Sequence, residues 1–264
     1  MKKYLVIGNP IDHSLSPKLH NYWFKMNNIN AIYEKKKIND EDIKNLVLDI
    51  KKGNISGANV TVPFKKTIIP FLDKLTLEAE KTQSVNTIYL NEDKIFGHNT
   101  DIDGFENSLK HIKYNVSGKK VLILGGGGVV SSIIFALNKM KCSEITLCNR
   151  TKHKAEKLKQ LYQSLNIVDW GEVPNFDIII NATSLGLNED DEISIDLSRV
   201  GKNKLFYDVI YNPKQTNFLK LGKRLGNQAQ NGKMMFIYQA QKSFEKWHKT
   251  LPEVNKEVEN LLDD

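Results

Sequence analysis

Residues 120–151 read KVLILGGGGVVSSIIFALNKMKCSEITLCNRT, and this stretch decides the fold. Its apolar run 121–124 ends at glycine, which is typical of a strand buried on both faces. Four glycines follow, then an apolar stretch of helical length at 129–140 and a second strand at 145–148. A turn without side chains between strand and helix lets a pyrophosphate approach the N–H groups of the helix N-terminus. The stretch therefore predicts a Rossmann-type dinucleotide-binding domain.

The composition is that of an ordinary globular chain. Its 264 residues, 40% of them hydrophobic and 26% charged, allow one large or two modest domains. The net charge is +7, but the lysines are spread along the chain and cluster only briefly at 35–37, so we expect no nucleic-acid partner. The apolar run at 4–7 is too short for an export signal, and no stretch approaches the length of a membrane span.

Two cysteines, Cys142 and Cys148, flank the second strand of the opening stretch. Small packing residues are the expected interpretation, rather than a disulfide or a metal pair. The sequence therefore predicts a cytoplasmic protein that contacts no membrane and has no metal site.

The chain before the glycine turn also alternates strands and helices, which predicts a second α/β domain with a mostly parallel sheet. Strands are expected at 4–7, 31–38, 55–60, 85–89 and 95–97, and helices at 16–26, 40–50 and 76–82. Ser16 before Pro17 predicts a hydroxyl cap at the start of the first helix. Its buried face is expected to consist of Leu19, Tyr22, Trp23 and Met26.

After the glycine turn, further buried strands are expected at 176–180, 205–210 and 228–231. Amphipathic helices follow at 234–251 and 254–262. Because a dinucleotide lies at the carboxyl ends of such strands, the residues that follow them are candidates for cofactor binding.

The residues after the second strand decide between NAD and NADP. An NAD site usually has an acidic residue at the end of this strand, to hold the ribose hydroxyls. Here the strand is followed by Asn149, Arg150, Thr151 and Lys152, and Glu144 lies at the wrong end. Arg150 can pair with a 2′-phosphate, supported by Thr151 and Lys152, so NADP(H) is favoured. The alternative is a helix start with solvated basic neighbours.

With these elements identified, the whole chain resembles the shikimate dehydrogenase family. The resemblance rests on short motifs in the family's order and at compatible spacing: SLSP at 14–17, NVTVPFK at 59–65, VNT at 85–87, NTD at 99–101, GGGGV at 125–129, NRT at 149–151, NATS at 181–184, YNP at 211–213, and the segment from Asn231-Gly232 to Gln239. Several motifs are weak alone, but together they are specific.

This resemblance implies reversible NADPH-dependent reduction of 3-dehydroshikimate to shikimate, a step of aromatic amino-acid biosynthesis. It implies a substrate domain over residues 1–103, a Rossmann NADP-binding domain over residues 104–232, and C-terminal helices over residues 233–264 that return to the first domain. A monomer and a homodimer are equally compatible with the sequence.

By the same resemblance, Lys65 and Asp101 are the catalytic pair at the reacting oxygen. Lys65 either transfers the proton or mainly positions and stabilises the alkoxide. Ser14 and Ser16 are expected to bind the substrate carboxylate. The ring hydroxyls of the substrate are expected to be bound by Asn59, Thr61, Asn86 and Gln239. Tyr211 is expected to border the substrate.

The expected cofactor-binding residues lie in the glycine turn, the NADP clamp and the later strand ends. They are Gly125, Gly126, Gly127, Gly128, Val129, Asn149, Arg150, Thr151, Lys152, Thr183, Val209, Gly232 and Met235. Tyr211 and Met235 could also be ordinary core residues. Val130 departs from the family pattern, because the fingerprint favours a small residue at this position for close helix packing.

Two other functions stay open at this point. One is an NAD-dependent quinate/shikimate dehydrogenase, which Arg150 disfavours. The other is a non-catalytic, regulatory NADPH-binding protein, which the presence of both Lys65 and Asp101 disfavours.

Overall fold

The computed structural model describes residues 1–263. The chain divides into two compact units. Unit 1 comprises Met1–Gly104 and the segment from Ile237 onward, and unit 2 comprises Phe105–Phe236. Each unit contains its own six-stranded sheet, so the predicted α/β class is confirmed.

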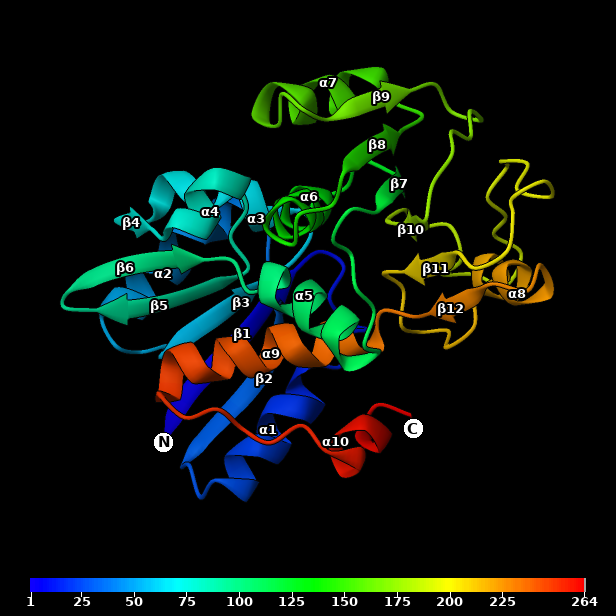
Figure 1. Cartoon of the computed structure of the whole chain (residues 1–264). Coiled ribbons are helices and arrows are strands. Elements are labelled where there is room, and N and C mark those ends of the chain that lie inside the picture. The colour runs from blue at the N-terminus through cyan, green and yellow to red at the C-terminus, as the bar shows by residue number, and fades with distance from the viewer. Residues whose placement is uncertain (264) are drawn as a thin grey trace. The chain divides into compact units, whose positions relative to one another are not determined.

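Unit 1 is built on a mixed sheet in the order β2-β1-β3-β5-β6-β4 (Figure 1). Its strands are β1 (Lys2–Gly8), β2 (Ala31–Lys37), β3 (Gly57–Val60), β4 (Lys74–Leu75), β5 (Thr87–Asn91) and β6 (Lys94–His98). Its helices are α1 (Ser16–Met26), α2 (Ile43–Lys51), α3 (Phe64–Thr67), α4 (Leu77–Thr82), most of α9 (Lys233–His248) and α10 (Lys256–Leu261). β1 is parallel to β2 and β3, whereas β5 is antiparallel to both β3 and β6.

The two faces of this sheet differ in chemistry because successive side chains of a strand point to opposite sides. Leu5 and Ile7 of β1 join the apolar cluster that contains α2. Tyr4, which precedes Leu5 and so points to the opposite face, lies 4.8 Å by ring centroid from Trp247 of α9. The indole N–H of Trp247 donates to the carbonyl oxygen of Ile88 at 3.0 Å. One face is therefore apolar core, and the other is covered by the chain's late helix.

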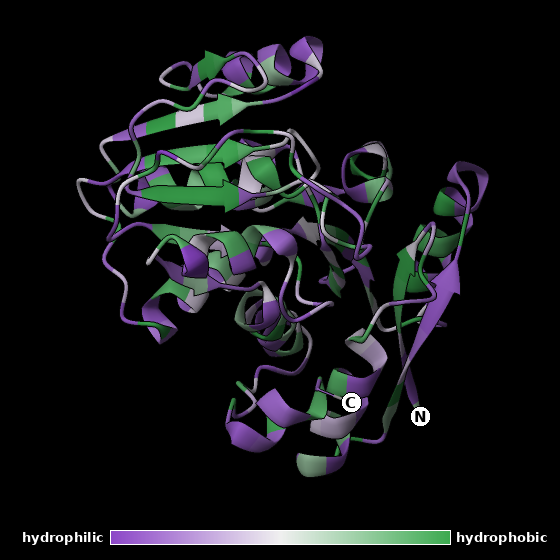
Figure 2. Cartoon of the chain, turned by 90° about the vertical axis from the view of Figure 1, so that its right-hand side faces the viewer, coloured by the Kyte–Doolittle hydropathy of each residue, from purple (hydrophilic) through white to green (hydrophobic). Residues whose placement is uncertain are grey.

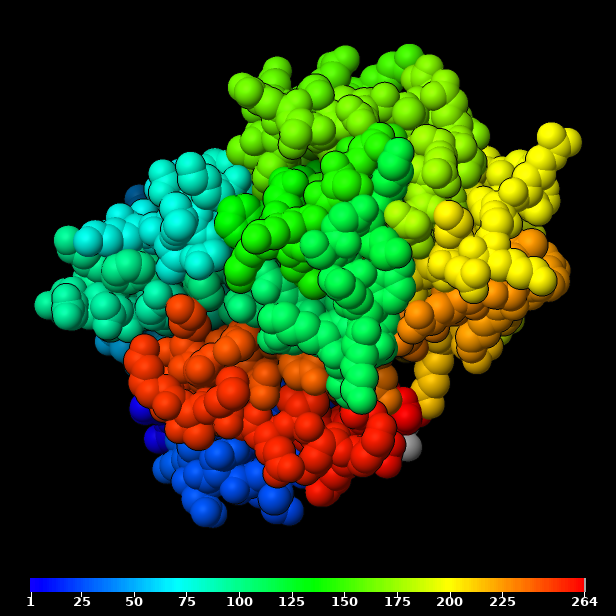
Figure 3. All heavy atoms as spheres, viewed as in Figure 1, coloured from blue at the N-terminus to red at the C-terminus, as the bar shows by residue number. Residues whose placement is uncertain are grey.

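Gly57 shows how closely α9 approaches the sheet. A Cβ at this position would lie 2.5 Å from Nε1 of Trp247, a distance that real Cβ atoms do not adopt. Residues of the C-terminal segment pack directly on the N-terminal segment in Figure 3, in agreement with the contact between α1 and α10.

The start of α1 differs from the prediction. Leu15 is the N-cap residue, and no side chain caps the helix. Ser16 is already the first helical residue and is buried. Its amide donates to Oγ of Ser14 at 3.3 Å. The predicted cap was therefore wrong, because Ser14 bonds the amide of Ser16 from two positions upstream.

The buried face of α1 is also rotated by one residue relative to the prediction. Leu19 and Trp23 are buried as expected, but His20 and Phe24 complete the face. Met26 is 57% exposed, and Tyr22 is only half-buried. Phe24 and His20 lie against Phe244 of α9, so a partner far along the chain selected the face.

Unit 2 contains an all-parallel sheet in the order β12-β11-β10-β7-β8-β9. Its strands are β7 (Lys120–Leu124), β8 (Glu144–Cys148), β9 (Asn166–Val168), β10 (Ile178–Asn181), β11 (Leu205–Asp208) and β12 (Gln228–Gln230). Its helices are α6 (Val130–Lys139), α7 (Lys152–Leu161) and α8 (Asn217–Arg224), together with most of α5 (Asp101–His111) and the start of α9. Figure 2 shows the central strands as mainly hydrophobic and the outer helix surfaces as mainly hydrophilic.

The opening stretch folds as predicted, with β7, a glycine turn, α6 and β8 in sequence. Val130 is fully buried at the first position of α6, so the larger residue fits the packing there. No helix within residues 1–263 is long and apolar enough to cross a membrane.

Candidate active site

Lys65 and Asp101 form a nearly buried ion pair in unit 1. Nζ of Lys65 lies 2.5 Å from Oδ2 of Asp101, and their side chains are only 14% and 7% exposed. Lys65 lies on the short helix α3, directly after the buried residue Phe64 in the sequence. The amide of Asp101, at the start of α5, donates to Oδ1 of Asn99 at 3.0 Å. The two residues predicted to be catalytic are thus held in direct contact.

Asn86 connects this pair to the late helix α9. Its Nδ2 donates to Oδ1 of Asp101 at 2.9 Å and to Oε1 of Gln239 at 3.3 Å. Its Oδ1 accepts from the backbone N–H of Thr100 at 2.8 Å. Four predicted site residues, Lys65, Asn86, Asp101 and Gln239, are therefore joined by one hydrogen-bonded network within unit 1.

Asn59 is also part of this network, but its amide is occupied by protein groups. Nδ2 donates to the carbonyl oxygen of Asn86 at 3.0 Å and to Oγ of Ser243 at 2.9 Å. Oδ1 accepts from the hydroxyl of Tyr33 at 2.7 Å. Nδ2 also lies 3.1 Å from Oγ1 of Thr87. This geometry suits a residue that holds its neighbours in position.

The predicted carboxylate site lies at the other end of the network. The hydroxyl of Tyr33 also bonds the side chain of Ser16. Burial raises the pKa of Tyr33 well above its usual value, and the bond to Ser16 opposes this shift, so the hydroxyl stays protonated. Ser14 bonds the amide of Ser16. The predicted residue Thr61 follows β3, and its amide donates to the carbonyl oxygen of Ile7 at 2.9 Å.

The glycine turn of unit 2 suits a phosphate ligand. Gly125 has φ of +102° and lies so close to Ala182 that a Cβ would be 2.9 Å from its carbonyl oxygen. A Cβ at Gly128 would meet no atom within 4 Å, so packing does not require glycine there. Glycine there leaves room for a ligand close to the backbone at the start of α6, where N–H groups lack helical partners. The turn therefore fits a pyrophosphate.

The predicted NADP clamp follows β8. Nδ2 of Asn149 donates to the carbonyl oxygen of Thr151 at 2.8 Å, which closes the segment into a turn. A Cβ at Gly126 would lie 3.1 Å from the side chain of Asn149. Arg150 is exposed, and Lys152 is the first residue of α7. The clamp and the glycine turn therefore lie next to each other in unit 2.

The other predicted cofactor residues lie at the ends of β10, β11 and β12. Oγ1 of Thr183 donates to Oδ1 of Asn181 at 2.7 Å. Gly232 packs on Val209 so closely that a Cβ would lie 2.1 Å from its carbonyl oxygen, so only glycine fits. Met235 is buried, which suits a core residue as well as a residue that borders a ring.

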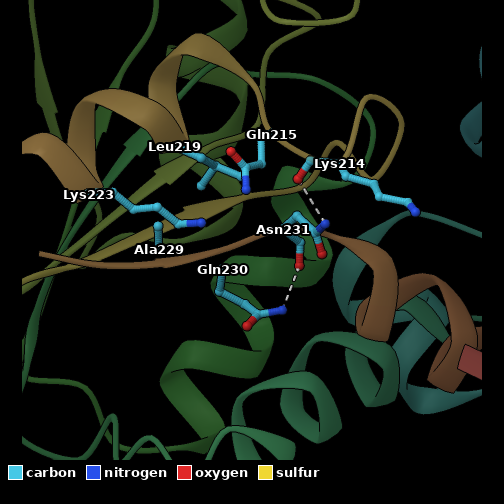
Figure 4. Close-up of a pocket in the computed structure, with 7 residues that line it drawn as sticks. All are labelled: Lys214, Gln215, Leu219, Lys223, Ala229, Gln230 and Asn231. Atoms are coloured by element: carbon cyan, nitrogen blue, oxygen red, sulfur yellow. Dashed lines mark hydrogen bonds between the residues drawn. The ribbon is translucent and has the colours of Figure 1, made fainter. Parts of the chain in front are cut away.

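Tyr211 stacks on Phe236, with ring centroids 4.6 Å apart and planes at 28°. It belongs to unit 2, whereas the other predicted substrate-binding residues belong to unit 1. A polar pocket in unit 2 (Figure 4) is lined by Lys214, Gln215, Leu219, Lys223, Ala229, Gln230 and Asn231. None of the predicted site residues lines this pocket.

Four residues of the substrate-side network were not predicted as site residues: Tyr33, Thr87, Thr100 and Ser243. Ser243 bonds Thr87 at 2.8 Å and Thr100 at 3.1 Å and is fully buried. It lies one helical turn after Gln239, a spacing that brings both side chains to one face of α9. That spacing was the available signal, whereas nothing in the sequence around Tyr33 distinguishes it from other strand residues.

Comparisons with known proteins agree with this geometry. Residues 6–88 match the family described as the shikimate dehydrogenase substrate binding domain, and residues 107–211 match the family described as shikimate / quinate 5-dehydrogenase. The chain is 59% identical over 262 residues to a shikimate dehydrogenase (NADP(+)) of Pelagibacter ubique, covering 99% of each chain.

Solved structures give the same result for the fold. The shikimate dehydrogenase of Aquifex aeolicus superposes with a TM-score of 0.92 at 36% identity, covering 100% of this chain and 98% of the other. The Thermus thermophilus enzyme, in complex with NADP(H) and shikimate, superposes with a TM-score of 0.91 at 28% identity, covering 100% and 99%. The chain belongs to the shikimate dehydrogenase family.

Proposed function

We propose that this protein catalyses the reversible NADPH-dependent reduction of 3-dehydroshikimate to shikimate. The observation that carries the proposal is the bonded group of Lys65, Asp101, Asn86 and Gln239 in unit 1. A cation beside a carboxylate suits an oxygen that gains and loses a proton, and side-chain amides suit ring hydroxyls because they both donate and accept.

Lys65 acts on the oxygen of the substrate ketone. NADPH, when bound, supplies the hydride that reduces this carbonyl. The ammonium group of Lys65 stabilises the negative charge that develops on the oxygen and donates a proton to it, and in the oxidation direction the amine takes the proton back. Asp101 orients Lys65 through Oδ2, while its Oδ1 is fixed by Asn86.

The remaining polar groups set the fit for a small polyol carboxylate. Ser14 and Ser16 donate hydroxyl hydrogen bonds to the carboxylate, while Thr61 and Gln239 bind ring hydroxyls. Because the amide of Asn59 is occupied by protein partners, we assign it to positioning of Asn86 and Tyr33. A substrate that lacks a hydroxyl would leave polar groups unpaired, which disfavours its binding.

The cofactor is assigned to unit 2. Gly125 to Gly128 and the start of α6 hold the pyrophosphate, and Asn149, Arg150, Thr151 and Lys152 bind the 2′-phosphate. Thr183, Val209, Gly232 and Met235 lie along the rest of the dinucleotide, and Tyr211 borders the substrate. We further propose that the enzyme is cytoplasmic, since both cysteines are free thiols, as a reducing compartment allows. We propose that it is a monomer or a homodimer.

Steady-state rates with NADPH and NADH, each on dehydroshikimate and dehydroquinate, test this function. We expect the highest kcat/KM for NADPH with dehydroshikimate. A preference for NADH and dehydroquinate would instead support the NAD-dependent alternative, and NADPH binding without turnover of either substrate would support a regulatory protein.

Lys65→Met should lower kcat by about 10²- to 10⁴-fold, because the proton donor is lost, while NADPH binding is kept. The matched control is Lys66→Met, since Lys66 is the adjacent lysine and is exposed. Calorimetric titration with NADPH and initial rates measure both effects. Near-normal turnover of the Lys65 variant would refute the assigned role.

A further inference from the structure

A carboxylate from a neighbouring strand lies beside the segment assigned to the 2′-phosphate. β8 pairs in parallel with β9, and Cys148 is the register partner of Val168. Asn149 and Asp169 therefore leave the sheet next to each other at its carboxyl edge (Figure 1). The thiol of Cys148 donates to the carbonyl oxygen of Asp169 at 3.3 Å, which holds the Asp169 backbone at the end of β8.

Asp169 binds the ammonium group of Lys152. Oδ1 of Asp169 lies 3.0 Å from Nζ of Lys152. The hydrogen bond and the charge of Asp169 raise the pKa of Lys152, with further contributions from Glu156 and Glu172. Arg150 forms no ion pair within residues 1–263. Of the two cations assigned to the 2′-phosphate, one is therefore available and the other is already paired.

The position of Lys152 explains why it takes a partner. It is the first residue of α7, a helix of ten residues whose first turn contains no acidic side chain. The N-terminus of a helix favours anions and disfavours cations. Asp169, the residue after β9, supplies the missing negative charge, and a phosphate bound at the same place would supply it as well.

We propose that Asp169 competes with the 2′-phosphate of NADP(H) for Lys152 and so sets how strongly the protein prefers NADP(H) over NAD(H). The proposal rests on the cofactor assignment of the proposed function, and it names Asp169 as a residue that weakens the binding of NADP(H). NAD(H) has no 2′-phosphate, so its binding leaves the pair intact. Removal of the carboxylate therefore strengthens binding of NADPH and leaves NADH unchanged.

The test is Asp169→Asn, with the dissociation constants of NADPH and NADH measured by calorimetric titration. Because an exposed ion pair is weak, the expected gain for NADPH is about two- to fivefold, with no change for NADH. In a Lys152→Gln background the gain should disappear, since the competition acts through Lys152.

The matched control is Glu144→Gln. Glu144 pairs with Lys120 at 3.2 Å, so the variant removes one carboxylate and one ion pair from the same sheet. It lies at the opposite end of β8, about 13 Å from its carboxyl end at 3.3 Å per residue, which exceeds a Debye length of about 8 Å. Its dissociation constants should equal those of the wild type.

Unchanged NADPH binding in Asp169→Asn would overturn the proposal, as would equal tightening of NADPH and NADH. Persistence of the gain without Lys152 would also overturn it. These failures differ from failure of the proposed function, which the same titrations would show as weaker binding of NADPH than of NADH to the wild type.

Discussion

A single amide, that of Asn59, links three segments of unit 1. Its oxygen accepts from Tyr33 on β2, and its nitrogen donates to Asn86 and to Ser243 on α9. The amide and both side chains are buried, so each lost bond leaves a polar atom without water. The hydroxyl of Tyr33 also interacts with Ser16, so it connects this amide to the proposed carboxylate site.

Tyr33→Phe should lower the free energy of unfolding by about 1–3 kcal/mol, because Oδ1 of Asn59 loses its donor. It should raise KM for shikimate more than it lowers kcat, since Ser16 loses its partner while Lys65 keeps Asp101. Urea unfolding and initial rates measure these effects. Tyr89→Phe, on a half-buried tyrosine of β5, is the control and should change neither quantity. Equal behaviour of the two variants would contradict the role of Tyr33.

At the scale of elements, the carboxyl ends of β10 and β11 are fastened by Asp208. Its Oδ1 accepts from Nδ2 of Asn181 at 3.1 Å and from the amide of Ile210 at 3.0 Å. Its Oδ2 accepts from the hydroxyl of Thr216, the N-cap of α8, at 2.6 Å. Burial raises the pKa of Asp208, and these three bonds oppose the shift. The loop that carries Tyr211 is thus held at both ends by one carboxylate.

Asp208→Ala should destabilise the protein by about 1–3 kcal/mol or more, because three buried donors lose their acceptor, and it should raise KM for NADPH. Asp208→Asn is the matched control, since an amide keeps the acceptor oxygen and can donate to the hydroxyl of Thr216. Denaturant unfolding and cofactor titrations compare the two. The interpretation would be wrong if Asn were as damaging as Ala.

Elements with a strong periodic pattern were predictable, and those fixed by distant partners were not. The strand, glycine turn and helix at 120–139 follow from local sequence alone. β9 has only three residues, and its side chains are half-buried or exposed, so it lacks an apolar signal. This strand, which was not predicted, is followed by Asp169, and Asp169 pairs with Lys152 of the predicted NADP clamp. The buried face of α1 was mispredicted because Phe244 of α9 selects it.

The candidate site divides in the same way, into residues that local motifs predict and residues that only distant partners define. Lys65, Asp101 and Asn86 belong to motifs that could be read from the sequence, and the structure brings them together. Asn59 was expected to bind substrate, whereas its protein partners were invisible in the sequence. Ser243 and Tyr33 are separated from Asn59 by 184 and 26 residues, so only the folded chain connects them.

At the scale of the whole molecule, buried histidines make stability depend on pH. His20 is fully buried among aromatic rings, and neither ring nitrogen has a hydrogen-bond partner within residues 1–263. Burial, followed by the charge of His248, lowers the pKa of His20 from 6.5 to about 3. Burial, followed by the charge of Lys246, lowers the pKa of His98 to about 4. Folding therefore requires both rings to be neutral.

Because these pKa values are depressed in the folded state, the unfolded chain binds more protons below pH 6.5. Stability is then complete above pH 6.5 and falls below it by about 1.4 kcal/mol per pH unit for each histidine, down to about pH 4 for His98 and about pH 3 for His20. His20→Phe should reduce this slope by one proton, as measured by urea unfolding between pH 7 and pH 4. His13→Phe, on an exposed ring, should leave the slope unchanged. An unaltered slope in the His20 variant would contradict this assignment.

Trp247, near the end of the chain, bonds to Ile88 and packs on Gly57 of the N-terminal sheet. This contact has a consequence for the order of folding during synthesis on the ribosome. Unit 1 consists of the first and last parts of the chain, whereas unit 2 is continuous. Unit 2 can therefore fold while translation proceeds, but the substrate sheet stays uncovered until Gln239, Ser243 and Trp247 have emerged. The nascent chain can therefore complete unit 2, to which we assign the cofactor, before the proposed substrate site of unit 1 is formed.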